Sequence, residues 1–355
     1  MPATLTTSPT VELLSREAWQ AAWHALPADR REVYWHPVFC AAAARWEGGV
    51  AECVRAAAGD GAWLLYPYVR HPVRGYDGFA DRWDAQTAYG YGGPLLVGDW
   101  EPAVAVDALR EIGRSLARRG AVAEFVRCHT EWVDTDALPA AGYRTPRVRT
   151  NVEYDLPPVG PVDEPWASNV RRNLRKAAAA GLRWSVSTHL AAFESLYRAT
   201  AHRLEMADAY RFDPAYFAAL HRLDPSRVKL ILVTTADGTP AAAALLFIGG
   251  RLAHYHLGAS DFAHQASRPN DLLYLAMATV ARDAGCARIV WGGGTSDDPA
   301  DTLLRFKSGF GAIRRPVHVG CRALDPDAYE RLIDAWTARH PDRAASSRLF
   351  LRYRT

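Results

Sequence analysis

The order of apolar and polar positions predicts alternating helices and strands along the whole chain. Apolar runs with the period of strands are expected at 51–57, 62–69, 121–127, 151–156, 228–235, 240–249, 252–258 and 287–291. Segments with the longer period of helices are expected at 37–46, 104–119, 166–180, 191–206, 214–222, 271–284 and 326–338. The strand at 151–156 stands isolated, whereas the turn ADGTP at 236–240 predicts a hairpin. The pattern therefore predicts a mixed α/β (α+β) fold.

The two halves of the chain share one order of elements: strand, glycine-bearing loop, helix, glycine and buried strand. In the first half these are YGYGGPLL, SLARRG and AVAEFV, and in the second HYHLGAS, TVARDAG and CARIVW. The similarity predicts an internal duplication, although helix–glycine–strand joints are common in unrelated α/β proteins. Residues 138–158 contain four prolines and separate the halves. We therefore predict one domain at 1–150 and a second at 151–320.

Composition narrows the class of protein. The 355 residues leave room for two domains, and 49% apolar with 23% charged residues is typical of a folded globular protein. We find neither an apolar stretch of about 20 residues, as a membrane span requires, nor a secretion signal. A cytoplasmic protein without a membrane span is therefore expected. The net charge of +3 permits a nucleic-acid partner without requiring one.

Cysteines and histidines give no sign of a metal site. The five cysteines are scattered without a CxxC pair, which indicates reduced structural thiols. His254 and His256 lie two apart on one strand face, with no third ligand near in sequence. We expect half-buried sheet histidines, and we predict neither a metal nor a cofactor.

The segment 288–310 offers the most specific chemistry. A buried strand is followed by Gly292, Gly293 and Gly294, an acidic turn and a short helix carrying Lys307. The glycines could expose amides that bind a carboxylate or a carbonyl, or could simply form a tight strand exit. Lys307 could stabilise an oxyanion, could bind the terminal ribose and phosphate of a donor, or could be an ordinary exposed lysine. The acidic residues Asp297, Asp298 and Asp301 could accept an incoming ammonium group, or could cap the helix that follows. We expect helix capping, with Asp298 before Pro299 as the N-cap.

A basic helix is predicted at 166–180 and ends at Gly181. Helical spacing puts Arg171 and Arg175 on one face, with Arg172 and Lys176 on the adjacent face. Such a strip can follow the phosphates of a nucleic acid. The alternative is a solvated charged face, which is common in proteins of every class.

Several motifs, in this order, resemble the Fem family of aminoacyl-tRNA-dependent peptidyltransferases. They are YGGPLL at 91–96, SNVRRNLRKAAAAGLRW at 168–184, ATAHRLEM at 199–206, AHYHLGAS at 253–260 and LLRFKSGFG at 303–311. The similarity covers most of 85–320, and the basic helix and the final motif are its specific parts. A clear counterpart of the family's N-terminal lysine is missing, although Arg45 lies in the right neighbourhood.

The resemblance implies roles for individual residues. Lys307, preceded by Phe306, takes the place of the family's functional lysine. Arg203 and Thr200 form a Thr-x-x-Arg element, in which Arg203 is suited to an acidic group of the acceptor. The predicted substrate-binding residues are Arg203, Tyr255, Tyr91, Gly292, Gly293, Gly294 and Phe306. The predicted tRNA-binding residues are Arg171, Arg172, Arg175 and Lys176.

The resemblance also implies a fold and an activity. We expect two tandem GNAT-like domains without the family's coiled-coil arm, because sustained heptads are missing, and with 321–355 packing back on the first domain. The expected reaction moves an amino acid from aminoacyl-tRNA to an amine, either a peptidoglycan precursor or a small natural-product amine. A monomer is favoured.

Two other classes of protein stay open. The first is an acyl-CoA-dependent N-acyltransferase, although neither GASDFAHQASRPNDLL nor YGGPLLVGDWEPAVA has the glycine spacing of a pyrophosphate loop. A thioester on another carrier is a variant of this class. The second is a catalytically silent protein that binds RNA or another anionic polymer through the basic helix.

Overall fold

The structure, a computed structural model, describes residues 9–58, 61–296, 298 and 300–355. Close packing divides the chain into two units. Unit 1 contains Tyr34–Val148 and Val317–Thr355 together with the described residues before Pro27, and unit 2 contains Pro27–Val33 and Arg149–Pro316. The domain boundaries predicted from the sequence stay a prediction, because a closely packed unit need not fold by itself.

Unit 1 is built on a mixed sheet. Its strands follow the order β1-β2-β3-β4-β6-β13, with β5 paired to β3. The pair β4–β6 is parallel, and the other described pairs of this sheet are antiparallel. The strands are β1 (Thr10–Leu13), β2 (Val50–Ala57), β3 (Trp63–Pro72), β4 (Trp83–Gln86), β5 (Leu95–Val97), β6 (Ala121–Arg127) and β13 (Ile313–Ala323), which begins in unit 2.

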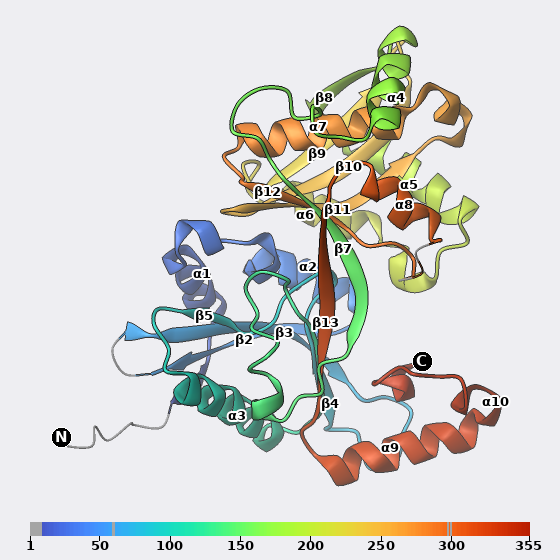
Figure 1. Cartoon of the computed structure of the whole chain (residues 1–355). Helices are drawn as coiled ribbons and strands as arrows, with labels where there is room; N and C mark the ends of the chain where they lie inside the picture. The colour runs from blue at the N-terminus through green and yellow to red at the C-terminus, as the bar shows by residue number, and fades with distance from the viewer. Residues whose placement is uncertain (1–8, 59–60, 297, 299) are drawn as a thin grey trace. The chain divides into compact units, whose positions relative to one another are not determined.

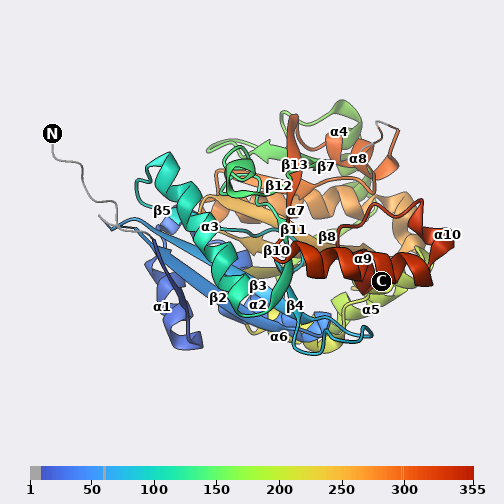
Figure 2. The same ribbon diagram turned by 90° about the horizontal axis from the view of Figure 1, so that it is seen from below.

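Helices cover the sheet of unit 1 with their apolar faces. They are α1 (Arg16–Ala25), α2 (Pro37–Glu47), α3 (Pro102–Arg118), α9 (Pro326–Arg339) and α10 (Pro341–Ala344). α3 buries Leu109, Ile112 and Leu116, which helical spacing puts on one face, and packs against β1, β2 and β6. Figure 2 shows α3 running beside β2. α9 contributes Leu332 and Trp336 to a core that also contains residues of β6.

A buried ion pair fastens β13 to the rest of unit 1. Arg322 is 8% exposed, and its Nη2 donates a hydrogen bond to Glu124 on β6 over 2.6 Å. The same guanidinium donates to the Tyr143 hydroxyl and to the carbonyls of Leu109 and Ala141. Tyr143 in turn donates to Glu124 over 2.8 Å. The charges therefore lie in a closed network that joins two strands, α3 and the segment before β7.

Unit 2 has a second mixed sheet, with the strand order β7-β12-β11-β10-β9-β8 (Figure 1). The pair β11–β12 is parallel, and the other pairs are antiparallel. The strands are β7 (Arg147–Asp155), which begins in unit 1, β8 (Arg183–Ser187), β9 (Val228–Thr234), β10 (Pro240–Ile248), β11 (Leu252–Ser260) and β12 (Arg288–Gly292).

The helices of unit 2 pack on its sheet. They are α4 (Ser168–Ala179), α5 (Leu190–Arg203), α6 (Pro214–His221), α7 (Pro269–Asp283) and α8 (Thr302–Ser308). α7 and Leu246 of β10 share the main core of the unit. The next residue, Phe247, points to the other face of the sheet and stacks on His256, which contacts Tyr216 of α6. α7 and α6 therefore cover opposite faces.

The segment Pro27–Val33 belongs to unit 2 although it precedes most of unit 1 in sequence. The Arg251 amide donates a hydrogen bond to the Asp29 carbonyl over 3.2 Å. A Cβ atom at Gly250 would lie 1.8 Å from the Ala28 carbonyl oxygen, and one at Gly249 would lie 2.1 Å from Glu32. Glycine is therefore required at both positions for this close approach.

Both units join a parallel pair of strands through a helix that ends in glycine. In unit 1, α3 leads through Gly120 into β6, and in unit 2, α7 leads through Gly285 into β12. The two glycines have φ of +97° and +84°, a conformation that favours glycine at a helix end. This correspondence agrees with the duplicated pattern of the sequence.

The structure corrects several predicted elements. The strand predicted to stand isolated at 151–156 is not isolated, because β7 pairs with β12 across the register Asp155↔Arg288. The sequence pattern also missed α1, β1, β4, β5, β8 and β13. The helices and strands that it did predict agree with the structure to within a few residues at each end. None of the described helices combines the length and apolar character required to cross a membrane.

Candidate active site

Lys307 lies near the end of α8 in unit 2, and its side chain is buried. It is 7% exposed, and its Nζ donates a hydrogen bond to the Gly293 carbonyl over 2.8 Å. The same nitrogen lies 5.5 Å from the centre of the Tyr255 ring, a distance typical of a cation–π contact. The alternative of an ordinary exposed helical lysine is therefore wrong.

The environment of Lys307 disfavours its positive charge. Burial, and to a lesser extent the nearby Arg149, lower the pKa of Lys307 to about 7, whereas Asp301 acts in the opposite direction. Near neutral pH the amine therefore divides between its charged and neutral forms. A perturbed amine of this kind is a candidate for function.

The three glycines at the end of β12 and just after it are required by backbone conformation or by close packing. Gly292 has φ of +76°, which favours glycine. A Cβ atom at Gly293 would lie 2.7 Å from the Thr150 carbonyl oxygen, and one at Gly294 would lie 2.4 Å from Asp301. These contacts support the tight strand exit, and the exit also turns the Gly293 carbonyl towards Lys307.

Asp301 is the N-cap of α8, so the prediction of Asp298 is wrong. Its carboxylate accepts hydrogen bonds from the amides of Leu304, Thr295 and Ser296 at 2.7–3.0 Å. The hydrogen bond from the Thr295 hydroxyl, followed by those from the Leu304 and Ser296 amides, holds the pKa of Asp301 well below its usual value. Asp298 instead accepts from the Ala300 amide within the turn, and Asp297 and Pro299 lie outside the described residues. Asp301 thus fixes the glycine turn to the start of the helix that carries Lys307.

Aromatic rings line one side of Lys307. The Tyr255 ring lies edge to face with Tyr274 at 5.5 Å, and Tyr274 contacts Phe306 at 5.3 Å. A Cβ atom at Gly258 would lie 2.1 Å from the Tyr255 hydroxyl, so the glycine leaves room for this ring. The structure therefore brings together Lys307, Tyr255, Phe306 and the glycine turn, which the sequence predicted separately.

Comparison with models of protein families finds a match in this region. Residues 167–308 match the family described as Acetyltransferase (GNAT) domain, and this range contains the surroundings of Lys307. A search of curated protein sequences finds no match.

Solved structures extend the similarity over most of the chain. FemX is 15% identical with a TM-score of 0.69, and the match covers 90% of this chain and 99% of that chain. The fold is therefore Fem-like. L-PGS from Bacillus licheniformis is 13% identical with a TM-score of 0.55, covering 85% of this chain and 91% of that chain. A tandem GNAT protein from the clavulanic acid biosynthesis pathway is 12% identical with a TM-score of 0.50, covering 89% and 99%.

The Fem-like fold confirms the predicted fold class of two tandem GNAT-like domains with mixed α/β structure. No coiled-coil arm of long paired helices is present in the part of the chain that the structure describes. The comparisons support a transferase of acyl groups.

The basic helix of the Fem-like fold is amphipathic. α4 buries Val170, Leu174 and Ala177, and exposes Arg172, Arg175 and Lys176. Arg171 is partly buried and donates to the Glu164 carbonyl, so part of its hydrogen-bonding capacity is already used. Three of the four predicted phosphate-binding side chains are thus exposed on one helix.

The remaining predicted residues form contacts of their own, and one of them belongs to the other unit. Arg203 is exposed at the end of α5, with its guanidinium 5.4 Å from the centre of the Phe262 ring. Thr200 is buried and bonded to the backbone of Ser260, which indicates a structural role. Tyr91 belongs to unit 1, where its ring packs against Tyr34 at 5.4 Å.

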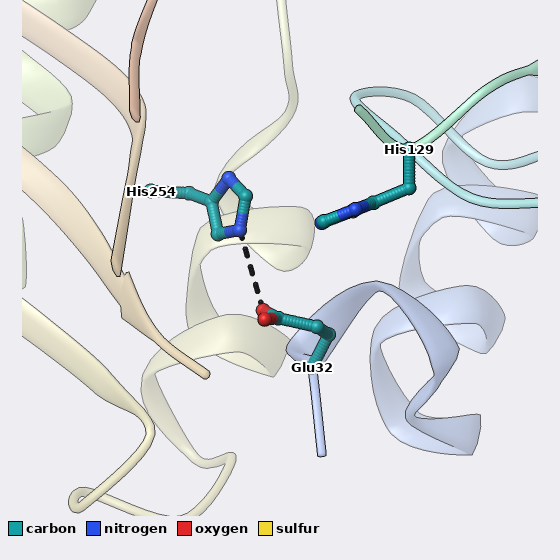
Figure 3. A group of neighbouring side chains, drawn as sticks. All are labelled: Glu32, His129 and His254. Atoms are coloured by element: carbon teal, nitrogen blue, oxygen red, sulfur yellow. Dashed lines mark ion pairs between the residues drawn. The ribbon is translucent and has the colours of Figure 1, made fainter. Parts of the chain in front are cut away.

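The histidines of β11 are buried, so the expected half-buried state is wrong. His254 is 1% exposed and forms an ion pair of 3.3 Å with Glu32, which is fully buried (Figure 3). The ring of His256 lies 2.9 Å from the Tyr216 hydroxyl, and burial lowers the pKa of His256 to about 3. β11 lies inside the sheet of unit 2, which explains the burial. Glu32 could not be assigned from the sequence, because its partner comes more than 200 residues later.

The shifted pKa of Lys307 makes the stability of the protein depend on pH. The native amine loses its proton at about pH 7, whereas an unfolded lysine keeps it to about pH 10.4. Between these values the unfolded state binds more protons, so the free energy of unfolding should rise with pH. Relative to Lys307→Met, the wild type should gain about 2 kcal/mol from about pH 7.5 to about pH 9.5.

Urea denaturation of both proteins at several pH values measures this gain. The comparison with the methionine variant cancels the other titrating groups of the chain. A difference that does not change with pH would show that the native amine keeps an ordinary pKa.

Proposed function

We propose that this protein is an aminoacyltransferase that moves an amino acid from aminoacyl-tRNA to an amine and forms an amide bond. The observation that carries the proposal is the buried Lys307, held on the Gly293 carbonyl beside Tyr255. The motifs around these residues resemble the Fem family, and the fold is Fem-like. The acceptor would be a peptidoglycan precursor or a small natural-product amine. The second choice is supported by the structural relative from the clavulanic acid biosynthesis pathway.

The reaction needs alignment and charge stabilisation. The acceptor nitrogen attacks the ester carbonyl carbon, the carbon–oxygen bond to the tRNA ribose breaks, and a proton of the amine goes to the ribose oxygen. The negative charge that builds on the carbonyl oxygen is where a cation helps most. The Lys307 ammonium donates one of its three N–H groups to the Gly293 carbonyl, which leaves two to donate to that oxygen. Burial strengthens the interaction because the local dielectric is low.

The other proposed contacts concern the donor and the acceptor. Arg172, Arg175 and Lys176 on the exposed face of α4, with Arg171 beside them, would bind tRNA phosphates. Arg203, Tyr255, Tyr91, Phe306 and the three glycines would contact the aminoacyl group or the acceptor. A tRNA donor would place the reaction in the cytoplasm, with the protein acting as a monomer.

An acyl-CoA-dependent N-acyltransferase is the second candidate, because residues 167–308 match the acetyltransferase (GNAT) domain. The loop before α7 is unsuited to binding the pyrophosphate of coenzyme A. Its residue at the helix start, Arg268, has φ of +64°, and the sequence ASRPNDLL offers no glycines for a pyrophosphate.

A transfer assay separates the candidates. Purified protein is mixed with a panel of tRNAs charged with radiolabelled amino acids and with a set of small amines, and products are identified by mass spectrometry. We expect amide products that disappear when the tRNA is digested with ribonuclease before the reaction. Activity that survives ribonuclease and depends on acyl-CoA would refute the tRNA donor and favour the second candidate.

A further inference from the structure

A pocket of about 390 Å³ lies in unit 1, within the size range of small-molecule sites. It is formed by the ends of α2, β3 and α9 and by the last residues of the chain. Its lining contains three arginines, Arg74, Arg339 and Arg354, together with His71 and His340. The proposed aminoacyl transfer uses none of these residues.

The three arginines reach the pocket from separate segments, and none of them forms an ion pair with a described carboxylate. Arg74 follows β3 and is exposed. Arg339 donates to the Gly75 carbonyl over 2.7 Å and lies 4.5 Å from the centre of the Tyr76 ring. Arg354 donates to the Gln86 side-chain oxygen over 3.1 Å. Neutral partners thus hold two of the guanidiniums in place without cancelling their charge.

The acidic side chain of the lining is already occupied. Glu47 is 9% exposed and accepts hydrogen bonds from His71 at 3.1 Å, Gln86 at 3.3 Å and the Tyr89 amide at 3.1 Å. Its oxygens therefore face their own donors. The three arginines outnumber Glu47 and the carboxylate of Thr355, so the lining keeps an excess of positive charge. Tyr353, which also lines the pocket, donates a hydrogen bond to the fully buried Asp84 over 2.7 Å. This bond holds the tyrosine side chain in place.

We propose that this pocket binds a small molecule through a phosphate or pyrophosphate group. Guanidiniums that approach from separate directions need a ligand with several acceptor oxygens. A phosphate or pyrophosphate offers them on more than one side, whereas a single carboxylate engages one arginine fork. The excess positive charge of the lining also favours an anion with several negative charges over a single carboxylate.

Calorimetric titration of the full chain with inorganic pyrophosphate, at fixed ionic strength, tests the proposal. We expect saturable binding with one site per chain. Arg74→Ala should weaken it at least about tenfold, or about 1.4 kcal/mol, and should leave the fold intact because Arg74 has no described partner. Arg331→Ala is the matched control, since Arg331 is an exposed arginine of α9 that packs over Phe79 outside the pocket lining.

The outcomes are distinct. Pyrophosphate binding that Arg74→Ala weakens and Arg331→Ala preserves supports the site. Absence of saturable binding, or equal weakening by both substitutions, overturns it. Malonate that binds as tightly as pyrophosphate overturns the choice of phosphate chemistry. The titration contains no tRNA or acceptor, so its result is independent of the proposed transferase activity.

Discussion

Lys307→Met is expected to reduce kcat/KM for aminoacyl transfer by about 100- to 1000-fold. The substitution removes the cation that the proposed reaction places beside the developing oxyanion, and methionine fills a similar volume in the buried position. Steady-state rates with a charged tRNA and a saturating amine measure the effect.

Arg305→Met provides the control for this prediction. Arg305 lies two residues away on the same helix and is exposed, so its loss removes a positive charge without touching the buried site. We expect it to change the rate by less than about threefold. Nearly equal rates in wild type and Lys307→Met, with both proteins folded by circular dichroism, would rule out the proposed role of Lys307.

The pH dependence of the transfer rate provides a second test of the role of the Lys307 ammonium. Because the pKa of Lys307 is lowered to about 7, the fraction of ammonium falls as pH rises through that value. The proposed charge stabilisation therefore predicts a decline of the wild-type rate on the alkaline side. The residual rate of Lys307→Met should lack this decline.

Arg322→Leu is expected to lower the free energy of unfolding by about 3–5 kcal/mol. The substitution leaves the fully buried Glu124 without its cation and removes the donor for the Leu109 and Ala141 carbonyls. Chemical denaturation monitored by tryptophan fluorescence measures the loss.

The double variant Arg322→Leu/Glu124→Leu distinguishes an uncompensated charge from lost packing. Removing both charges should recover a large part of the stability, because a buried pair can often be replaced by apolar residues. A single variant within about 1 kcal/mol of the wild type would contradict the prediction. If the double variant does not recover stability, the loss in the single variant comes from the missing hydrogen bonds to the Leu109 and Ala141 carbonyls and to Tyr143.

The regular elements could be predicted where the apolar pattern was strong and local. The hairpin of β9 and β10 and the strand β6 follow directly from their sequences, as does the end of α4 at Gly181 with its positive φ. β13 could not be predicted in this way. Its sequence IRRPVHVGCRA contains three arginines and a proline, and it becomes a strand because β6 pairs with it and Glu124 pairs with Arg322.

The candidate site was predictable in its residues and not in its environment. Lys307, Tyr255, Phe306 and the glycines stand in motifs that the sequence displays. The contacts that define them come from distant segments, because Arg149 lies on β7 and Tyr274 lies on α7. The same limit applies to Asp301, whose role depends on amides that face it only after the glycine turn has formed.

The placement of Pro27–Val33 has a consequence for biosynthesis. These residues are made before their partners, because the turn with Gly249 and Gly250 and the strand with His254 follow more than 200 residues later. Glu32 therefore waits without its histidine while most of the polypeptide is synthesised. The segment can therefore take up its native contacts only after β10 and β11 have been made, so translation order and assembly order differ at this point.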